Sequence, residues 1–176
     1  MAVYERYTES ARRSVFFAVW YSRLRESDEI DSVDLLRGLM HDDDSRANSV
    51  FGLREYFPVH QGGPSKFATP GEVSKTDPVL TNEAKRILAW TAREADGIRD
   101  YWIDSEHLLL GILREPRCTA ARYLSRTGLT LEKARVRVLQ NKTSRHQYGA
   151  IPASWSTQSP LGWFFSKLRM RKQRPG

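Results

Sequence analysis

Residues 103–113 read Ile103-Asp104-Ser105-Glu106-His107-Leu108-Leu109-Leu110-Gly111-Ile112-Leu113, and this stretch decides the fold because a degraded copy of it occurs earlier in the chain. The earlier copy, residues 30–40, reads Ile30-Asp31-Ser32-Val33-Asp34-Leu35-Leu36-Arg37-Gly38-Leu39-Met40. A register shared over a long stretch without a gap indicates an internal duplication. The same offset of 73 residues also pairs Thr8 with Thr81, Ala11 with Ala84 and Arg13 with Arg86.

Both copies carry the signals of a buried helix. Ser32 and Ser105 are expected to accept a hydrogen bond from a free N–H of the first turn, and the acidic residue just inside favours the positive helix end. Apolar residues at three- and four-residue spacing then predict one buried face. A glycine inside a helix costs about 1 kcal/mol relative to alanine. We therefore expect Gly38 and Gly111 to mark places where a neighbouring helix comes close.

At these residues the chain resembles the Clp N-terminal domain family, also called the Clp repeat domain. The second copy matches the family pattern closely, whereas Val33-Asp34 in the first stands where the family has Glu-His. The resemblance covers roughly residues 3 to 141, and it implies an all-α fold of two stacked helical repeats related by a pseudo-twofold. The matching positions of the second repeat are Thr81, Ala84, Lys85, Ile103, Glu106, His107, Leu108 to Leu110, Gly111, Ala120, Ala121, Leu124 and Gly128.

In this family the domain receives substrates and adaptors at the front of the Clp protein-unfolding ATPases. The resemblance therefore implies a stand-alone Clp repeat protein without an ATPase module, which binds protein substrates, an adaptor, or Clp ATPase or peptidase subunits. Such a protein would modulate the delivery of proteins for degradation.

Glu106 is the candidate ligand-binding residue. Some family members recognise phosphoarginine through a motif glutamate in each repeat, and only the second repeat keeps this residue, since Val33 replaces the first. A carboxylate pairs well with a guanidinium, and free N–H groups at helix starts suit a phosphate. The alternative is that Glu106 only stabilises a helix start, which is worth about 0.3–1 kcal/mol.

The sequence favours binding over catalysis. It has no G-x-x-x-x-G-K-[ST] phosphate loop, so the chain by itself is not a nucleotide-driven unfoldase. Cys118 beside Arg117 is expected to be a packed thiol, and His107 a core or helix-start residue. The four His residues are too scattered to suggest a metal site, so we expect no cofactor and no metal.

We predict a double repeat domain over residues 1–142, with repeat one at about 3–57, a linker at 58–79 and repeat two at 80–141. Three Pro/Gly-containing breaks between Pro58 and Pro78 leave no clear fourth helix in repeat one. Helices are expected at about 8–25, 32–40, 46–53, 81–96, 119–126 and 130–141, besides the second motif helix.

Most of the net positive charge lies in the C-terminal residues 143–176, called the tail below. The net charge is +7, but residues 143–176 hold six of the 28 bases and none of the 21 acids. With no apolar run of about 20 residues, no signal-peptide pattern and a single cysteine, a cytoplasmic protein is expected.

The segment 161–172 alternates bulky apolar and basic residues after a Ser/Pro/Gln-rich stretch. It can form a basic amphipathic helix that contacts an anionic membrane, which would make the protein a peripheral, tethered scaffold. Alternatively, its aromatic residues pack on the repeats. Nucleic acid is a weaker partner because no groove-reading motif accompanies the bases. The candidate contact residues are Trp163, Phe164, Phe165, Lys167, Arg169, Arg171 and Lys172.

Overall fold

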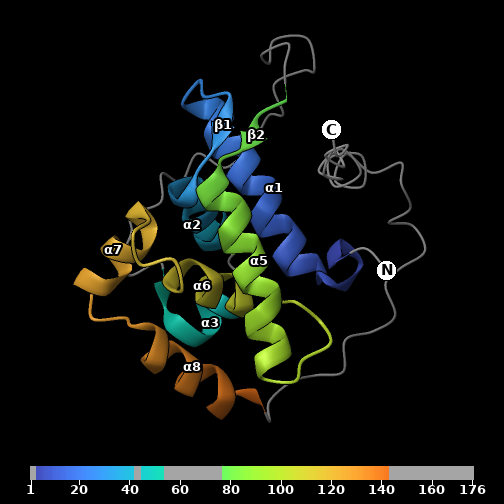
Figure 1. The fold of residues 1–176 in the computed structure, drawn as a ribbon, viewed down its shortest axis with the longest axis vertical. Helices are drawn as coiled ribbons and strands as arrows, with labels where there is room; N and C mark the ends of the chain where they lie inside the picture. The colour runs from blue at the N-terminus through green and yellow to red at the C-terminus, as the bar shows by residue number, and fades with distance from the viewer. Residues whose placement is uncertain (1–2, 42–44, 54–76, 143–176) are drawn as a thin grey trace, which may run out of the picture. The chain divides into compact units, whose positions relative to one another are not determined.

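The computed structural model describes residues 3–41, 45–53 and 77–142, which form two helical repeats (Figure 1). The first repeat contains the 3-10 helix η1 (Val3–Arg6), α1 (Glu9–Leu24), β1 (Glu29–Ile30), α2 (Ser32–His41) and α3 (Arg46–Phe51). The second contains β2 (Val79–Leu80), α5 (Asn82–Gly97), α6 (Ser105–Leu113), α7 (Thr119–Arg126) and α8 (Leu131–Gln140). The predicted all-α architecture is confirmed.

The predicted helix starts are largely confirmed. Hydroxyl side chains accept hydrogen bonds from first-turn N–H groups and so satisfy backbone donors that have no partner inside the helix. These caps are Thr8 of α1, Ser45 of α3, Thr81 of α5 and Thr130 of α8.

The 73-residue offset of the sequence reappears in the backbone. α5 begins and ends 73 residues after α1, and α6 and α7 begin 73 residues after α2 and α3. Glu26 and Arg99, which follow α1 and α5 at the same offset, are both left-handed, with φ of 55° and 57°. The helix predicted at about 81–96 ends at Gly97, the last helical residue of α5, and the left-handed residue that completes the turn is Arg99.

Backbone pairing joins the two repeats reciprocally. In the parallel pair of β1 and β2, Ile30 lies opposite Leu80, and an isolated parallel bridge joins Tyr7 to Ile103. At the 73-residue offset, Leu80 corresponds to Tyr7, and Ile103 corresponds to Ile30. The same two positions therefore pair across the repeats twice, once in each direction. This exchange is the signature of the predicted pseudo-twofold.

Two serines make a second reciprocal exchange. The Ser105 hydroxyl accepts a hydrogen bond from the Ala47 N–H at the start of α3, at 3.1 Å. Ser32 does the same for the Ala120 N–H at the start of α7, at 3.5 Å. Each motif serine therefore satisfies a first-turn donor of the opposite repeat.

The prediction that Ser32 and Ser105 cap their own helices is wrong. Asp104 is the N-cap of α6, and the Asp31 carboxylate accepts from two first-turn N–H groups of α2. Asp and Ser are about equally good caps, so the sequence alone did not separate the two adjacent positions.

Close helix approach occurs at both motif glycines, as predicted. A Cβ atom on Gly38 would lie 2.6 Å from the Ala18 nitrogen of α1. A Cβ atom on Gly111 would lie 2.7 Å from the Ile87 oxygen and 2.9 Å from the Thr91 nitrogen, both in α5. The absence of a side chain is therefore what lets α2 pack on α1 and α6 on α5.

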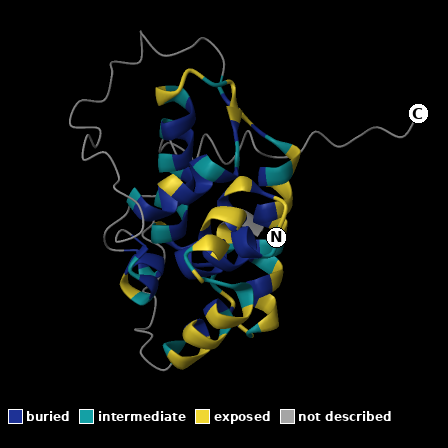
Figure 2. Cartoon of the chain, turned by 90° about the vertical axis from the view of Figure 1, so that its left-hand side faces the viewer, coloured by how far each residue is buried: buried dark blue, intermediate teal, exposed yellow. Residues whose placement is uncertain are grey.

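α6 is the centre of the domain. All of its residues from Ser105 to Leu113 are buried, and it contacts helices of both repeats. Figure 2 shows the exposed surface on the outer sides of the surrounding helices. The second motif therefore sits in the core.

The buried carboxylate of Glu94 forms ion pairs that link α8 to the core. Glu94 in α5 is 3 % exposed and accepts hydrogen bonds from Arg135 in α8, at 2.7 and 2.8 Å, and from Arg114 after α6, at 2.5 Å. Burial alone would raise the pKa of Glu94, but the hydrogen bonds and charges of Arg135 and Arg114 outweigh it and hold the pKa below its ordinary value. Ala134 and Val138 are the buried residues of α8.

Several predictions fall outside the described residues. These concern the acidic run 42–44, the fourth helix of repeat one, the linker 58–76 and the tail 143–176, so the domain boundaries stay predictions. Within the part of the chain that the structure describes, none of the helices has both the length and the apolar character needed to cross a bilayer.

Candidate functional site

The first turn of α6 is built around a reciprocal cap between Asp104 and His107. The Asp104 carboxylate accepts a hydrogen bond from the Ser105 N–H at 2.6 Å, and the His107 ring accepts one from the Asp104 N–H at 2.9 Å. Thr8 of the first repeat also donates its hydroxyl to Asp104, at 3.0 Å. The prediction that His107 is a helix-start residue is confirmed.

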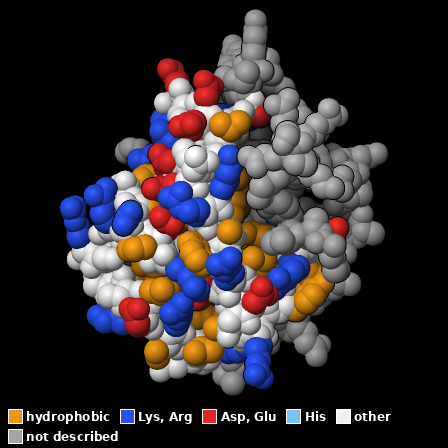
Figure 3. All heavy atoms as spheres, in the orientation of Figure 1, with side chains coloured by type: hydrophobic (Ala, Val, Ile, Leu, Met, Phe, Trp, Pro, Cys, Tyr) orange, Lys and Arg blue, Asp and Glu red, His pale blue; other side chains and the backbone are white. Residues whose placement is uncertain are grey.

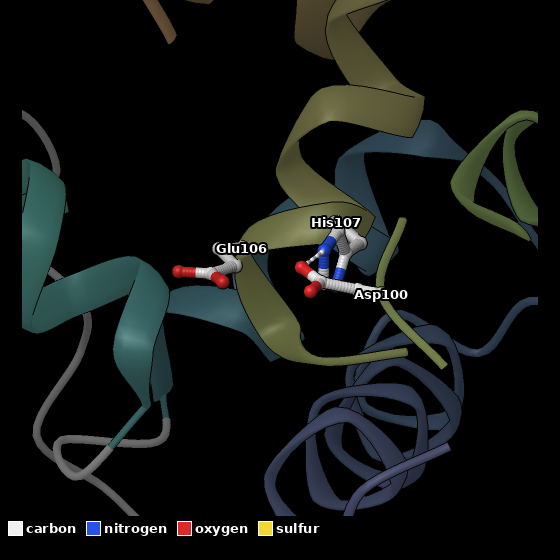
Figure 4. A group of neighbouring side chains, drawn as sticks. All are labelled: Asp100, Glu106 and His107. Atoms are coloured by element: carbon white, nitrogen blue, oxygen red, sulfur yellow. Dashed lines mark hydrogen bonds and ion pairs between the residues drawn. The ribbon is translucent and has the colours of Figure 1, made fainter. Parts of the chain in front are cut away.

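His107 is held on its other side by Asp100 (Figure 4). The distance from His107 Nε2 to Asp100 Oδ2 is 3.2 Å, and Lys142 lies 3.1 Å from the other oxygen of Asp100. Because Nδ1 accepts from a backbone N–H, the proton of a neutral ring belongs on Nε2, which donates to Asp100.

Asp100, Glu106 and His107 place their ligand atoms within 4.8 Å of one another, as a metal site would. A metal, however, needs a free lone pair on the imidazole. Both ring nitrogens of His107 already take part in hydrogen bonds, so coordination would dismantle the cap of α6. The cluster is better explained as a polar network that sets the start of this helix.

Glu106 points away from His107 (Figure 4) and toward the first repeat. Its side chain is fully buried, and Oε2 lies 3.2 Å from Nε of Arg46, the first residue of α3. The Arg46 guanidinium also donates to the Asn141 carbonyl oxygen at 3.3 Å and lies 3.9 Å from Asp104. The residue predicted to bind a guanidinium therefore contacts one supplied by the chain itself.

The first repeat has a different arrangement at the equivalent place. Asp34 occupies the position of His107, is fully buried and accepts a hydrogen bond from the Asp31 N–H at 3.0 Å, as His107 does from Asp104. Arg25 donates to Asp34 at 2.7 and 3.0 Å, and these hydrogen bonds raise the pKa of the Arg25 guanidinium. An Asp–Arg pair thus replaces the His–Asp pair of the second repeat.

Sequence reasoning missed Arg46, Asp100 and Arg25. Asp100 and Arg25 lie outside the repeated motif, and their contacts depend on turns that follow α5 and α1. For Arg46, a usable signal is the comparison of the repeats, because the 73-residue offset places Arg46 opposite Thr119 just as it places Glu106 opposite Val33. The two charged residues that pair in space are thus both replaced by uncharged ones at the counterpart positions.

Cys118 is a structural thiol. It is fully buried, and its sulfur caps α7 by accepting a hydrogen bond from the Ala121 N–H at 3.2 Å. Burial raises the pKa of the thiol, which lowers the fraction of nucleophilic thiolate. Ser45 is its counterpart in the first repeat and caps α3 in the same way.

Aromatic residues of α1 gather around His41 at the end of α2. The ring centroids of Phe17 and His41 are 4.0 Å apart, and the Tyr21 hydroxyl lies 3.0 Å from His41 Nδ1. Phe17 and Trp20 remain partly exposed, while the opposite side of α1 is buried in the core. The first helix is thus central to the core and still presents aromatic rings at the surface.

A groove of about 530 Å³ lies where α3 of the first repeat meets the α7–α8 segment of the second. Phe51, Leu129 and Val136 provide apolar surface, Lys133 and Arg137 provide positive charge, and Glu132 provides one negative charge. Figure 3 shows Lys and Arg side chains spread among apolar ones over this part of the domain. Val136 is 53 % exposed.

The predicted tail contacts, from Trp163 to Lys172, lie outside the described residues.

Comparison with known proteins points to one family. The model of the Clp repeat (R) N-terminal domain family matches residues 65–148. ClpC/MecB of Bacillus subtilis, named a negative regulator of genetic competence, is 28 % identical over 141 residues, which are 78 % of this chain and 17 % of that protein. The chaperone protein ClpB of Oceanobacillus iheyensis is 40 % identical over 60 residues, 34 % of this chain and 7 % of that protein. The chain thus spans less than a fifth of the length of these relatives.

Solved structures show the same fold. The N-terminal domain of the chaperone ClpD from Arabidopsis thaliana superposes with a TM-score of 0.59, covering 81 % of this chain and 97 % of that domain at 22 % identity. A second structure, from work on a malarial protein secretion system, has a TM-score of 0.56, with the same coverage at 17 % identity. At these identities the likeness establishes the fold alone.

Proposed function

Since the chain belongs to the Clp N-terminal domain family, we propose that it is a non-catalytic protein-binding module that modulates the delivery of proteins to a Clp unfoldase and its peptidase. The observation that carries this proposal is the pair of reciprocally joined repeats. They form the same domain that is found in Clp proteins, and the described surface offers apolar and basic contacts.

The groove between α3 and α8 is the proposed contact surface for an extended segment of a client protein. Its apolar lining would hold apolar side chains. Lys133 and Arg137 outnumber Glu132, the one acidic residue of the lining, and so favour a segment that also carries acidic residues. Exposed Val136 lies in the groove and gives a variant that should not disturb the core.

Within this function, we propose that Glu106 reads arginine-phosphorylated clients. The support is chemical. A buried carboxylate binds an incoming guanidinium strongly when that guanidinium takes the place of a partner with the same charge. The contact with Arg46 supports the proposal, because Glu106 already pairs with a guanidinium within the protein. With Val33 at the counterpart position, one such site is proposed per chain.

The test is a degradation assay with a Clp ATPase, its peptidase and fluorescent casein, either unmodified or arginine-phosphorylated. Adding the purified chain should change the rate of casein loss. Val136→Asp should abolish the effect, while Leu24→Asp, at a position 61 % exposed and outside the groove, should retain it. Glu106→Gln should remove only the preference for phosphorylated casein. An unchanged rate at saturating chain, with no binding to either casein, would refute the proposal.

A membrane-tethered scaffold is the second candidate, and it rests on the apolar-basic alternation of residues 161–172 in the sequence. Cosedimentation with anionic vesicles distinguishes the two functions. Tethering requires binding that disappears when residues 161–172 are deleted, while client delivery without tethering predicts no vesicle binding.

A further inference from the structure

α7 and the turn before it carry three exposed arginines, called the arginine row below. Arg117 precedes the N-cap of α7, and Arg122 and Arg126 lie on the helix itself. Residues 116–131 contain no acidic residue. Within the part of the chain that the structure describes, Arg122 and Arg126 form neither an ion pair nor a side-chain hydrogen bond. Figure 3 shows Lys and Arg side chains at the surface over α7.

The acidic residue beside the row already has a basic partner. Glu115 accepts two hydrogen bonds from Arg86, at 3.1 and 3.2 Å, and its side chain is largely buried. These hydrogen bonds, and to a lesser extent the charge of Arg117, hold the pKa of Glu115 below its ordinary value. Glu115 thus balances part of the charge of Arg117, whereas Arg122 and Arg126 keep theirs for a partner.

The duplication indicates that the fold does not need the row. At the 73-residue offset none of the three arginines has a basic counterpart, and the counterparts are Asp44, Ser49 and Leu53. A positive charge is unfavourable just before a helix and favourable in its last turn. Helix electrostatics therefore account for Arg126 but disfavour Arg117, which stands where the first repeat has an aspartate.

The row begins at the edge of the groove between α3 and α8. Arg126 is directly followed by residues 127–129, which line that groove. Arg122 lies about 6 Å from Arg126 along the helix axis, and Arg117 lies beyond the other end of α7. A segment that leaves the groove along α7 would therefore pass the arginines one after another.

We propose that the arginine row binds an acidic stretch of the client segment whose apolar part occupies the groove. This inference rests on the proposed function and narrows the client class to segments in which an apolar stretch adjoins alternating acidic residues. Side chains on one face of an extended segment recur about every 7 Å, which is close to the spacing of Arg122 and Arg126. A guanidinium matches a carboxylate through its planar fork of donors.

A polypeptide fits this face better than a nucleic acid. Single-stranded nucleic acids combine basic residues with aromatic rings on which successive bases stack. α7 contains one ring, that of Tyr123. Trp90 of α5 is already engaged, because the guanidinium carbons of Arg93 and Arg114 lie 4.7 and 4.3 Å from its ring centroid. The face therefore offers charge without a stacking platform.

The experiment is a fluorescence anisotropy titration of the full chain with labelled probes. The acidic peptide has an apolar half followed by alternating Glu and Ser residues, and the neutral peptide has Gln in place of every Glu. Oligothymidylate is the nucleic-acid probe. Wild type should bind the acidic peptide several-fold more tightly than the neutral one. This preference should shrink as salt is added, because exposed charges are screened.

Variants of the row separate binding from stability. Arg122→Gln/Arg126→Gln should weaken the acidic peptide about fivefold and leave the neutral one unchanged, since each exposed ion pair contributes modestly. The matched control, Arg37→Gln/Arg99→Gln, removes the same charge at exposed positions outside the row and should bind like wild type. Arg117→Gln should weaken the acidic peptide without lowering the melting temperature, which a purely structural role would not allow.

The outcomes distinguish the row from the groove. Val136→Asp, in the groove, should weaken both peptides alike. Equal affinity of wild type for the two peptides, or equal losses in the row variant and its control, overturns the arginine row and leaves the groove intact. Tighter, row-dependent binding of oligothymidylate assigns the face to nucleic acid and also overturns the proposal. If neither peptide binds the folded wild type, the groove itself is not a peptide site, and the proposed contact with clients is wrong as well.

Discussion

Gly111 sets the distance between α5 and α6. The effect of substituting it on stability can therefore be predicted. In Gly111→Ala the new methyl would lie under 3.0 Å from backbone atoms of Ile87 and Thr91, which cannot move without shifting α5. Overpacking of this kind costs about 1–3 kcal/mol. We expect the free energy of unfolding, measured by urea denaturation, to fall by that amount.

Gly97→Ala is the matched control, because it lies in α5 and its Cβ would meet nothing within 4 Å. Alanine is the better helix former, so this variant should be as stable as wild type or slightly more stable. Equal stability of the Gly111 and Gly97 variants would show that the two helices do not approach as closely as described.

At the residue scale, the sequence predicted features that depend on local chemistry. Gly38 and Gly111 follow from a glycine conserved between two copies of a helix, and the role of His107 follows from its place at a helix start. The partner of Glu106 could not be predicted, because Arg46 lies 60 residues away in sequence and reaches it only when the repeats pack. Contacts across a pseudo-symmetric interface are set by tertiary packing, which spacing along the chain does not encode.

At the scale of elements, the attachment of α8 depends on charge. Glu94 joins Arg135 of α8 to Arg114 at the end of α6, and α8 buries few apolar side chains of its own. Because the pKa of Glu94 is lowered in the folded protein, its contribution is complete above the ordinary pKa of 4.5. That contribution is lost as pH falls through the lower, folded-state value.

We therefore expect Glu94→Gln to destabilise the domain at pH 7 by about 1–2 kcal/mol, allowing for solvent screening of the partly exposed guanidinium groups. Below pH 4 the difference from wild type should shrink, because acid removes the same charge from Glu94. Thermal unfolding at several pH values measures this difference, and hydrogen exchange should show faster opening of α8. A difference that stays constant from pH 7 to pH 3 would contradict the ionic role.

Element boundaries were predicted well wherever a cap or a turn residue marks them. Thr8 caps α1, and the helix predicted at 119–126 is α7, which is followed by left-handed Gly128. The prediction failed where two adjacent residues cap equally well, as at Asp104 and Ser105. Asp104 is the N-cap of α6, and the Ser105 hydroxyl instead accepts a hydrogen bond from the first repeat. Only the packed structure shows which of the two residues has which role.

At the scale of the whole molecule, the reciprocal exchanges make the two repeats one folding unit. Each repeat supplies one partner to the Ile30–Leu80 pair and one to the Tyr7–Ile103 bridge, and α6 of the second repeat contacts helices of the first. A single repeat would expose this buried surface, and a fragment of about 60 residues is marginally stable even when its core is complete.

The fragments 1–76 and 77–142 should therefore not fold separately. We expect each alone to show weak helical circular dichroism without a cooperative thermal transition, because half of every reciprocal contact is missing. Mixing the two at equal concentration should restore both the helical signal and a single transition, since the contacts that join the repeats are noncovalent. A Ser105→Ala change in the second fragment should weaken this reassembly, as it removes the acceptor for the Ala47 N–H of the first, at a cost of about 1 kcal/mol. If fragment 77–142 alone melts cooperatively near the temperature of the full chain, the repeats are independent domains, and the exchange between them is not what stabilises the fold.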